Sequence, residues 1–132
     1  FRPKRADSLV LVVFKSSYVS LAAMILYHAT TLDAAVSIEK DQLFVCGNRG
    51  YAGPGIYFSE DETSALHHCF NGRGGAEVII VCEVDVGEVL DAGKNEANED
   101  VCIANGRDSV RIIGTDTICV YDSDRIQIRM FQ

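Results

Sequence analysis

The stretch Gly53-Pro54-Gly55-Ile56-Tyr57-Phe58-Ser59 joins a glycine-rich loop to a short β-prone run near the middle of this 132-residue chain. The loop itself, Gly47 to Gly55, holds four glycines and one proline in nine residues. Glycine lets a backbone approach a ligand closely, and a tyrosine at the edge of such a loop can stack on a flat ring. The sequence therefore predicts a short strand over Ile56–Phe58 that presents Tyr57 to a ligand.

A second motif, Tyr27-His28-Ala29-Thr30, ends the apolar run Met24–Ala29, which is a candidate strand. A histidine beside hydroxyl side chains suits a ligand with sugar hydroxyls, and Tyr57 suits its aromatic base. Each residue alone has an ordinary structural explanation. A histidine at a strand end is more often a satisfied structural residue, and Tyr57 could belong to the core.

Hydroxyl-x-x-acid patterns predict where two helices begin. Thr30-Thr31-Leu32-Asp33 opens a helix whose apolar face is Leu32, Ala35 and Val36, and Ser59-Glu60-Asp61-Glu62 opens another that runs to about Phe70. A turn follows at Asn71–Gly75.

Alternation and β-branched content predict the remaining strands. They cover Leu9–Phe14, Gln42–Cys46, Val78–Val86, Ser109–Ile113, Thr117–Tyr121 and Arg125–Phe131, with a polar loop over Gly93–Asp100. In the strand Val78–Val86, one face is predicted to hold Val78, Ile80, Cys82, Val84 and Val86. Glu83 and Asp85 lie on the other face. In the last strand, Ile126, Ile128 and Met130 point inward. Two helices near the front and strands behind them predict an α+β domain.

Length and composition limit the classes of protein to which the chain can belong. One domain over residues 1–132, with 1–8 as an N-terminal extension, fits the length and the 48% hydrophobic content. Nineteen acidic against twelve basic residues give a net charge of −7, which disfavours nucleic acid as a partner because phosphate binding needs clustered Lys and Arg. The apolar stretch Leu9–Tyr27 is interrupted by polar residues, so we expect no membrane span.

The five cysteines are scattered and odd in number, which predicts reduced thiols and a cytoplasmic or nuclear protein, with secretion as an effector left open. A metal site is suggested by the adjacent residues His67, His68 and Cys69, with Cys82 as a fourth ligand. Consecutive helical residues point in different directions, however, so we expect no metal site.

Five segments in sequence order resemble the catalytic domain of the poly(ADP-ribose) polymerase family. Tyr27-His28-Ala29-Thr30 is similar to its His-Gly-Ser/Thr motif, and Gly53–Ser59 to its Gly-x-Gly-Ile-Tyr-Phe segment. The others are Ser64-Ala65-Leu66-His67-His68-Cys69, Asp108-Ser109-Val110, and Val120-Tyr121-Asp122 followed by Gln127-Ile128-Arg129. The resemblance runs from Ile25 to Phe131. It implies the ADP-ribosyltransferase fold, a split β-sandwich of two antiparallel sheets with flanking helices around an NAD⁺ cleft.

The same resemblance implies a role for each site residue. His28 would bind an adenosine-ribose hydroxyl, with Thr30 beside it, and Gly55 would let the loop approach NAD⁺. The Ala29 backbone and the Ser64 hydroxyl would hold the nicotinamide carboxamide, while Tyr57, with His67 in place of a second tyrosine, would stack on the ring. NAD⁺ would be the co-substrate, with no metal, and a protein side chain the acceptor.

One catalytic position departs from the family pattern. Polymerising members have a glutamate five positions before the Asp of Val-Tyr-Asp, and counting back from Asp122 gives Thr117. Threonine carries no charge to stabilise a cation or act as a base, and strand alternation points the neighbouring Asp116 to the opposite face. The prediction is therefore mono-ADP-ribosylation. The alternative is an inactive module that binds NAD⁺, ADP-ribose or a protein; an NAD⁺-dependent RNA 2′-phosphotransferase is disfavoured by the acidic charge.

Overall fold

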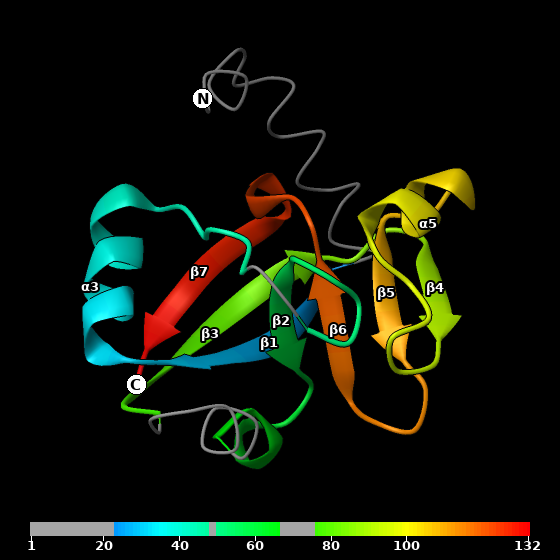
Figure 1. The fold of residues 1–132 in the computed structure, drawn as a ribbon. Coiled ribbons are helices and arrows are strands. Elements are labelled where there is room, and N and C mark those ends of the chain that lie inside the picture. The colour runs from blue at the N-terminus through cyan, green and yellow to red at the C-terminus, as the bar shows by residue number, and fades with distance from the viewer. Residues whose placement is uncertain (1–22, 48–49, 67–75) are drawn as a thin grey trace.

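The computed structural model describes residues 23–47, 50–66 and 76–132, and these form an α+β domain built on one twisted sheet (Figure 1). Its strands are β1 (Ala23–Thr30), β2 (Ile56–Ser59), β3 (Val78–Asp85), β4 (Val89–Ala92), β5 (Ser109–Ile112), β6 (Thr117–Val120) and β7 (Ile126–Phe131). The helices are α3 (Leu32–Asp41), α5 (Glu99–Ala104) and the 3₁₀ turn η1 (Ser123–Arg125), and residues 62–66 are also helical.

The strand order is β4-β5-β6-β2-β1-β3-β7, so the described strands pair into one seven-stranded sheet. The division into two antiparallel sheets is not confirmed, and β4 pairs with β5 in parallel. The sheet nevertheless has a weak seam. β1 and β3 share eight paired positions, whereas β1 and β2 meet only at Tyr27 and Ser59. The strands β1, β3 and β7 therefore form one half, and β2, β6, β5 and β4 the other (Figure 1).

Two clusters of buried side chains form the core, and the larger one joins the two halves. The larger cluster lies across the seam, because it joins Leu26 of β1 and Ile80 of β3 to Phe58 of β2 and Ile118 of β6. The smaller one packs Cys102 of α5 against β5 and β6. Burial of apolar surface on both sides of the seam compensates for its few ladder hydrogen bonds.

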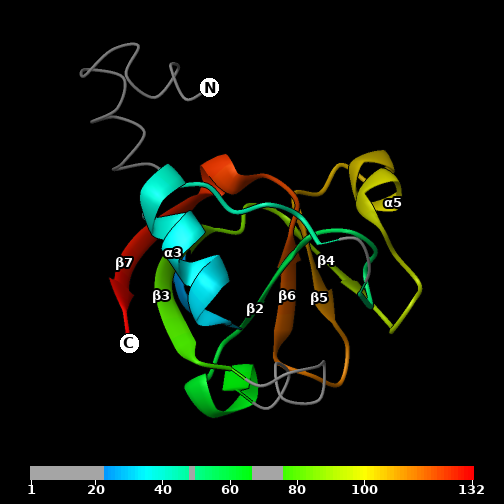
Figure 2. The same cartoon turned by 60° about the vertical axis from the view of Figure 1, so that its left-hand side comes forward.

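Helix α3 packs over β3 (Figure 2). Its N-cap is Thr31, one residue later than the first threonine of the predicted pattern, and the Thr31 hydroxyl accepts a hydrogen bond from the Ala34 amide at 3.3 Å. The predicted apolar face is wrong in part. Ala35 and Ile38 are the buried residues of α3, while Leu32 and Val36 are 54% and 56% exposed.

The predicted strand over Gln42–Cys46 is absent, and these residues form an irregular strap after α3. Gln42 adopts a left-handed conformation (φ 56°) at the helix C-terminus, which turns the chain out of the helix. The Phe44 amide then donates to the Ser123 hydroxyl at 2.8 Å. Side-chain and loop contacts thus replace the ladder that an apolar run alone suggests.

The other predicted elements have mixed outcomes. The strands at β1, β2, β3, β5, β6 and β7 are confirmed with bounds shifted by a residue or so. The predicted helix start at Ser59 is wrong, because Ser59 ends β2. The cap is Asp61, whose carboxylate accepts from the Ser64 amide at 3.1 Å, and the helix is seen over 62–66. The predicted strand Leu9–Phe14, the rest of that helix and the turn Asn71–Gly75 lie outside the described residues.

Two elements were not predicted from the sequence, and two strand faces differ from the pattern. β4 pairs with β5, and α5 begins inside the segment predicted as a loop over Gly93–Asp100. In β3, Ile79 and Val81 are also buried, so both faces of its first half are covered. The β3–β7 register shifts between Val81 and Cys82. Met130 therefore turns outward and is 49% exposed rather than buried.

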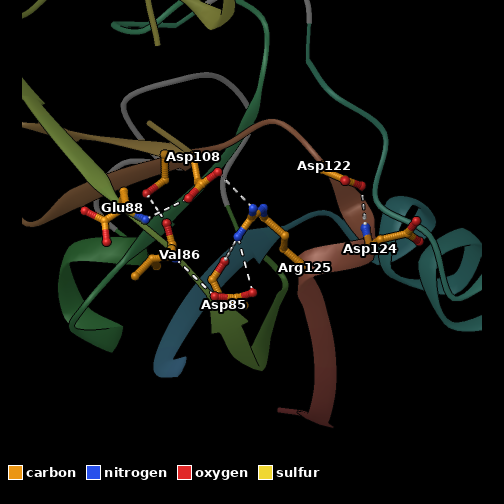
Figure 3. Close-up of polar contacts among 9 residues, drawn as sticks. Asp85, Val86, Glu88, Asp108, Asp122, Asp124 and Arg125 are labelled. Atoms are coloured by element: carbon orange, nitrogen blue, oxygen red, sulfur yellow. Dashed lines mark hydrogen bonds and ion pairs between the residues drawn. The ribbon is translucent and has the colours of Figure 1, made fainter. Parts of the chain in front are cut away.

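A polar cluster ties the beginnings of β5 and β7 to the end of β3 (Figure 3). The Arg125 guanidinium lies 3.3 Å from the Asp85 carboxylate and 3.0 Å from that of Asp108, and it donates to the Asp85 carbonyl at 3.1 Å. Asp108 also accepts from the Glu88 amide at 2.8 Å, and the Ser109 hydroxyl donates to the Val86 carbonyl at 2.7 Å. The Asp108-Ser109-Val110 segment therefore has a structural role.

Candidate functional site

The motifs single out His28 and Tyr57, and these two residues are in contact at the seam between β1 and β2. The His28 Nδ1 atom lies 2.7 Å from the Tyr57 carbonyl oxygen. A carbonyl only accepts hydrogen bonds, so Nδ1 carries the proton and donates it. In the neutral ring Nε2 is then an acceptor, which suits the hydroxyl of a sugar.

Aromatic rings fix the orientation of the His28 imidazole. Its centroid lies 5.3 Å from that of Phe44, edge to face, and 5.6 Å from that of Phe58. Burial among these rings lowers the pKa of His28 below its ordinary 6.5, and the bond to the Tyr57 carbonyl opposes that shift only in part. The site therefore holds a neutral histidine at pH 7.

Sequence reasoning missed Phe44. Its apolar neighbours suggested a strand, whereas the strap points its side chain at His28. The one clue to its role in the sequence is that a large aromatic residue lies between the histidine and glycine motifs. A short apolar run alone does not distinguish an irregular strap from a strand.

A pocket of about 170 Å³ opens beside His28 and Tyr57. It is lined by Tyr27, His28, Ala29, Tyr57, Phe58, Ser59 and Ala65. Pockets that enclose whole drug-sized ligands commonly measure about 300–1,000 Å³, so this pocket is smaller than that range. Ser64 adjoins the lining residue Ala65 but does not itself line the pocket.

The Tyr57 hydroxyl is fully engaged by the preceding loop. It accepts from the Ala52 amide at 2.8 Å and donates to the Gly53 carbonyl at 2.5 Å. Gly50 packs directly on the ring, because a Cβ there would come within 2.4 Å of it. Burial raises the pKa of Tyr57 well above its ordinary range, so the phenol stays protonated.

Three of the predicted ligand-binding residues lie elsewhere or cannot be placed. Gly55 lies against β6, where a Cβ would meet the Cys119 sulfur at 2.3 Å, and it does not line the pocket. Thr30 ends β1 opposite Val78 and is likewise outside the lining. His67 lies outside the described residues.

Thr117 is buried at the start of β6, where it pairs with Ser59 of β2. Directly opposed residues share a face of the sheet, so Thr117 and Ser59 lie on the face that also holds Tyr57 and its partner Cys119. Asp116 precedes β6, and its carbonyl accepts from the Glu60 amide at 3.3 Å. Thr117 is one strand beyond the pocket lining.

Within the described residues, no group of three or more His, Cys, Asp or Glu side chains is arranged to hold a metal ion. His67, His68 and Cys69, from the weighed metal hypothesis, fall outside them. No helix in the described part of the chain has the length and hydropathy to cross a bilayer.

The fold defines an α+β domain with a small pocket at the seam between β1 and β2. The model of the poly(ADP-ribose) polymerase catalytic domain matches residues 5–127, and the chain belongs to this family. A search of curated protein sequences gave no match. Family membership confirms the resemblance drawn from the motifs and supports an NAD⁺-dependent ADP-ribosyltransferase.

Proposed function

We propose that the protein is a mono-ADP-ribosyltransferase that moves ADP-ribose from NAD⁺ to a protein side chain. The observation that supports single transfer is the β2–β6 register, in which the residue opposite Ser59 on the pocket face is the uncharged Thr117. Chain growth needs a carboxylate there to activate a ribose hydroxyl. The adjacent acid, Asp116, lies just before β6 and outside the paired strand.

The reaction replaces one bond to the nicotinamide ribose by another. The bond from the anomeric carbon to the nicotinamide nitrogen breaks, and its electron pair leaves with neutral nicotinamide. The acceptor nucleophile then bonds to the oxocarbenium-like carbon, and any proton it carried goes to water. An acidic acceptor would supply its own carboxylate. Positioning and electrostatic stabilisation would provide most of the rate enhancement.

Each site residue has a role in this proposal. Neutral His28 would accept a hydrogen bond from an adenosine-ribose hydroxyl through Nε2, which the Nδ1 contact leaves as an acceptor. The Tyr57 ring would stack on nicotinamide, and the Ala29 backbone with the Ser64 hydroxyl would hold the carboxamide. The pocket of about 170 Å³ fits that ring and part of its ribose.

The remaining predicted residues would assist from the margin of the pocket. Gly55 would act by closing the loop onto β6, since it packs on Cys119. Thr30 would lie beside the adenosine ribose, and His67 would face Tyr57 across the nicotinamide. Thr117 would orient the nicotinamide ribose by hydrogen bonding alone. The split between two half-sheets around NAD⁺ would correspond to the β1–β2 seam.

A second candidate is an NAD⁺- or ADP-ribose-binding module without turnover, which Thr117 also favours because it removes the charge that stabilises a cation. Calorimetry with NAD⁺ followed by a nicotinamide-release assay separates the two. Binding with release supports the transferase, and binding without release supports the module. If neither is observed, the proposed site is wrong. Incubation of cell lysate with labelled NAD⁺ then identifies the acceptor and its compartment, which we expect to be cytoplasmic or nuclear.

A further inference from the structure

Tyr121, the residue after β6, reaches under the loop that precedes Tyr57. Its hydroxyl donates to the Ala52 carbonyl at 2.7 Å, and Ala52 is completely buried. The amide of the same alanine donates to the Tyr57 hydroxyl at 2.8 Å. One buried residue of the loop therefore connects the two phenols through its own backbone groups.

The bond network leaves the Tyr57 ring little freedom. The Tyr57 phenol oxygen accepts from the Ala52 amide and donates to the Gly53 carbonyl, so both of these partners come from the loop. The Cys119 thiol of β6 also lies beside the phenol. Gly50 covers the ring at a distance that only a glycine permits. The conformation of the loop therefore helps to set the direction of the ring, and a contact that fixes the loop also restrains Tyr57.

Tyr121 is well suited to fix the loop. Its ring packs against Gly55, where a Cβ would come within 3.1 Å of it. Burial raises the pKa of Tyr121 far above its ordinary range, so the hydroxyl remains a donor at any physiological pH. From the other side, the loop is held by a backbone contact, the Asn95 amide donating to the Tyr51 carbonyl at 2.8 Å.

We propose that Tyr121 is a positioning residue for nicotinamide binding, because its hydroxyl holds Ala52 and thereby aims the Tyr57 ring into the pocket. The proposal rests on the proposed function, in which Tyr57 stacks on nicotinamide. Tyr121 does not line the pocket itself. Its effect passes through the loop and shows in ligand affinity, beyond any effect on stability.

The test is Tyr121→Phe, which removes one oxygen and keeps the ring on Gly55. The matched control is Tyr51→Phe, which removes a hydroxyl from a 42% exposed side chain of the same loop and keeps its backbone contact. Calorimetry measures the affinity of benzamide, a nicotinamide mimic, and NMR measures amide exchange at Ala52. We expect Tyr121→Phe to weaken the binding of benzamide roughly 5–10-fold and to speed hydrogen exchange at the Ala52 amide. We expect Tyr51→Phe to change neither quantity.

The outcomes separate this proposal from the proposed function. If the unmodified protein binds neither benzamide nor NAD⁺, the proposed function is contradicted and the positioning role with it. If it binds both and Tyr121→Phe binds benzamide equally well, the positioning role alone is overturned. A lowered thermal midpoint with unchanged affinity would show that Tyr121 is merely structural and would also overturn it.

Discussion

At the scale of single residues, the orientation and tautomer of His28 are fixed by its neighbours. Its Nδ1 donates to the Tyr57 carbonyl and its ring packs between Phe44 and Phe58, so a contact within the protein selects the tautomer before any ligand arrives. This arrangement commits Nε2 to an acceptor role. A substitution that retains the Nδ1 contact and removes Nε2 therefore tests the atom that would bind a ligand hydroxyl in the proposed function.

His28→Asn is that substitution, because the asparagine amide nitrogen can occupy the place of Nδ1. We expect the variant to fold and to bind NAD⁺ about tenfold more weakly or worse, since a ligand hydroxyl loses its acceptor and the imidazole surface is gone. Calorimetry measures the affinity, and circular dichroism checks the fold. Unchanged NAD⁺ affinity would remove His28 from the site.

The pKa of His28 also predicts a pH dependence of stability. The pKa is lowered in the folded protein from 6.5, so the unfolded chain binds the proton more readily. The free energy of unfolding therefore falls as the pH drops through 6.5 toward the folded-state pKa, and it levels off above 6.5.

Urea unfolding at about pH 7.5 and about pH 5.5 measures this dependence. His28→Asn should show a shallower loss of stability between the two values, because only the His28 contribution is absent. His67 and His68 are present in both proteins and serve as internal controls. Equal losses in the two proteins would mean that His28 titrates as freely in the folded state as in the unfolded chain.

At the scale of elements, helix α3 shows how much a cap contributes. Thr31 at the N-cap accepts from the Ala34 amide, and Ser37 lies exposed in the middle of the same helix. Thr31→Ala should lower the free energy of unfolding by about 1 kcal/mol. Ser37→Ala should raise it by a few tenths of a kcal/mol, because alanine is the better helix former.

Denaturant unfolding distinguishes the two changes by their sign. The same experiment tests the position of the cap, since the sequence pattern favoured Thr30, which the structure assigns to the end of β1. A loss for Thr31→Ala no larger than the change for Ser37→Ala would contradict the Thr31 cap.

The elements that the sequence predicted are those with a strong local signal. The long alternating run of β3 and the Thr-rich start of α3 are such cases. The strap at Gln42–Cys46 was mistaken for a strand, because its apolar run is satisfied by Phe44 packing on His28 and not by a ladder. The pairing of the four-residue β4 depends on β5, which a local pattern does not contain.

The start of helix α5 carries a capping signal in the sequence. Asn98 accepts from the Val101 amide at 2.9 Å and is followed by Glu99 and Asp100, an amide cap with two acids in the first turn. The segment Gly93–Asp100 was predicted as a loop because it is polar, although it contains this capping pattern. Six residues give too few apolar positions to show helical periodicity.

At the scale of the whole molecule, long-range contacts position the site. The motifs predicted that His28 and Tyr57 belong together, and the structure brings them into contact across the seam. Phe44 and Tyr121 were not predicted to contact these motifs, because Phe44 lies on an irregular strap and Ala52, the partner of the Tyr121 hydroxyl, is 69 positions away. Sequence patterns identify groups that carry chemistry more readily than groups that hold them.

The Arg125 cluster tests how the two ends of the sheet are held together (Figure 3). Arg125 is 26% exposed and bridges Asp85 of β3 and Asp108 before β5. Arg125→Met should lower the free energy of unfolding by about 1–3 kcal/mol, because two partly buried carboxylates lose their cation.

Arg107→Met is the matched control, since Arg107 and Glu88 form a pair that is 42% and 73% exposed. Such a pair contributes less than about 1 kcal/mol. Both variants are compared by urea unfolding at the same pH. Equal losses would show that the Arg125 cluster is no more important than an exposed surface pair.

The central claim, single transfer of ADP-ribose from NAD⁺, is tested most directly by mass spectrometry of acceptor proteins after incubation with the enzyme and labelled NAD⁺. With Thr117 in place of a carboxylate on the pocket face, we predict that every modified side chain carries one ADP-ribose unit and that nicotinamide is released in equal amount. Long chains that a poly(ADP-ribose) glycohydrolase degrades would contradict the account.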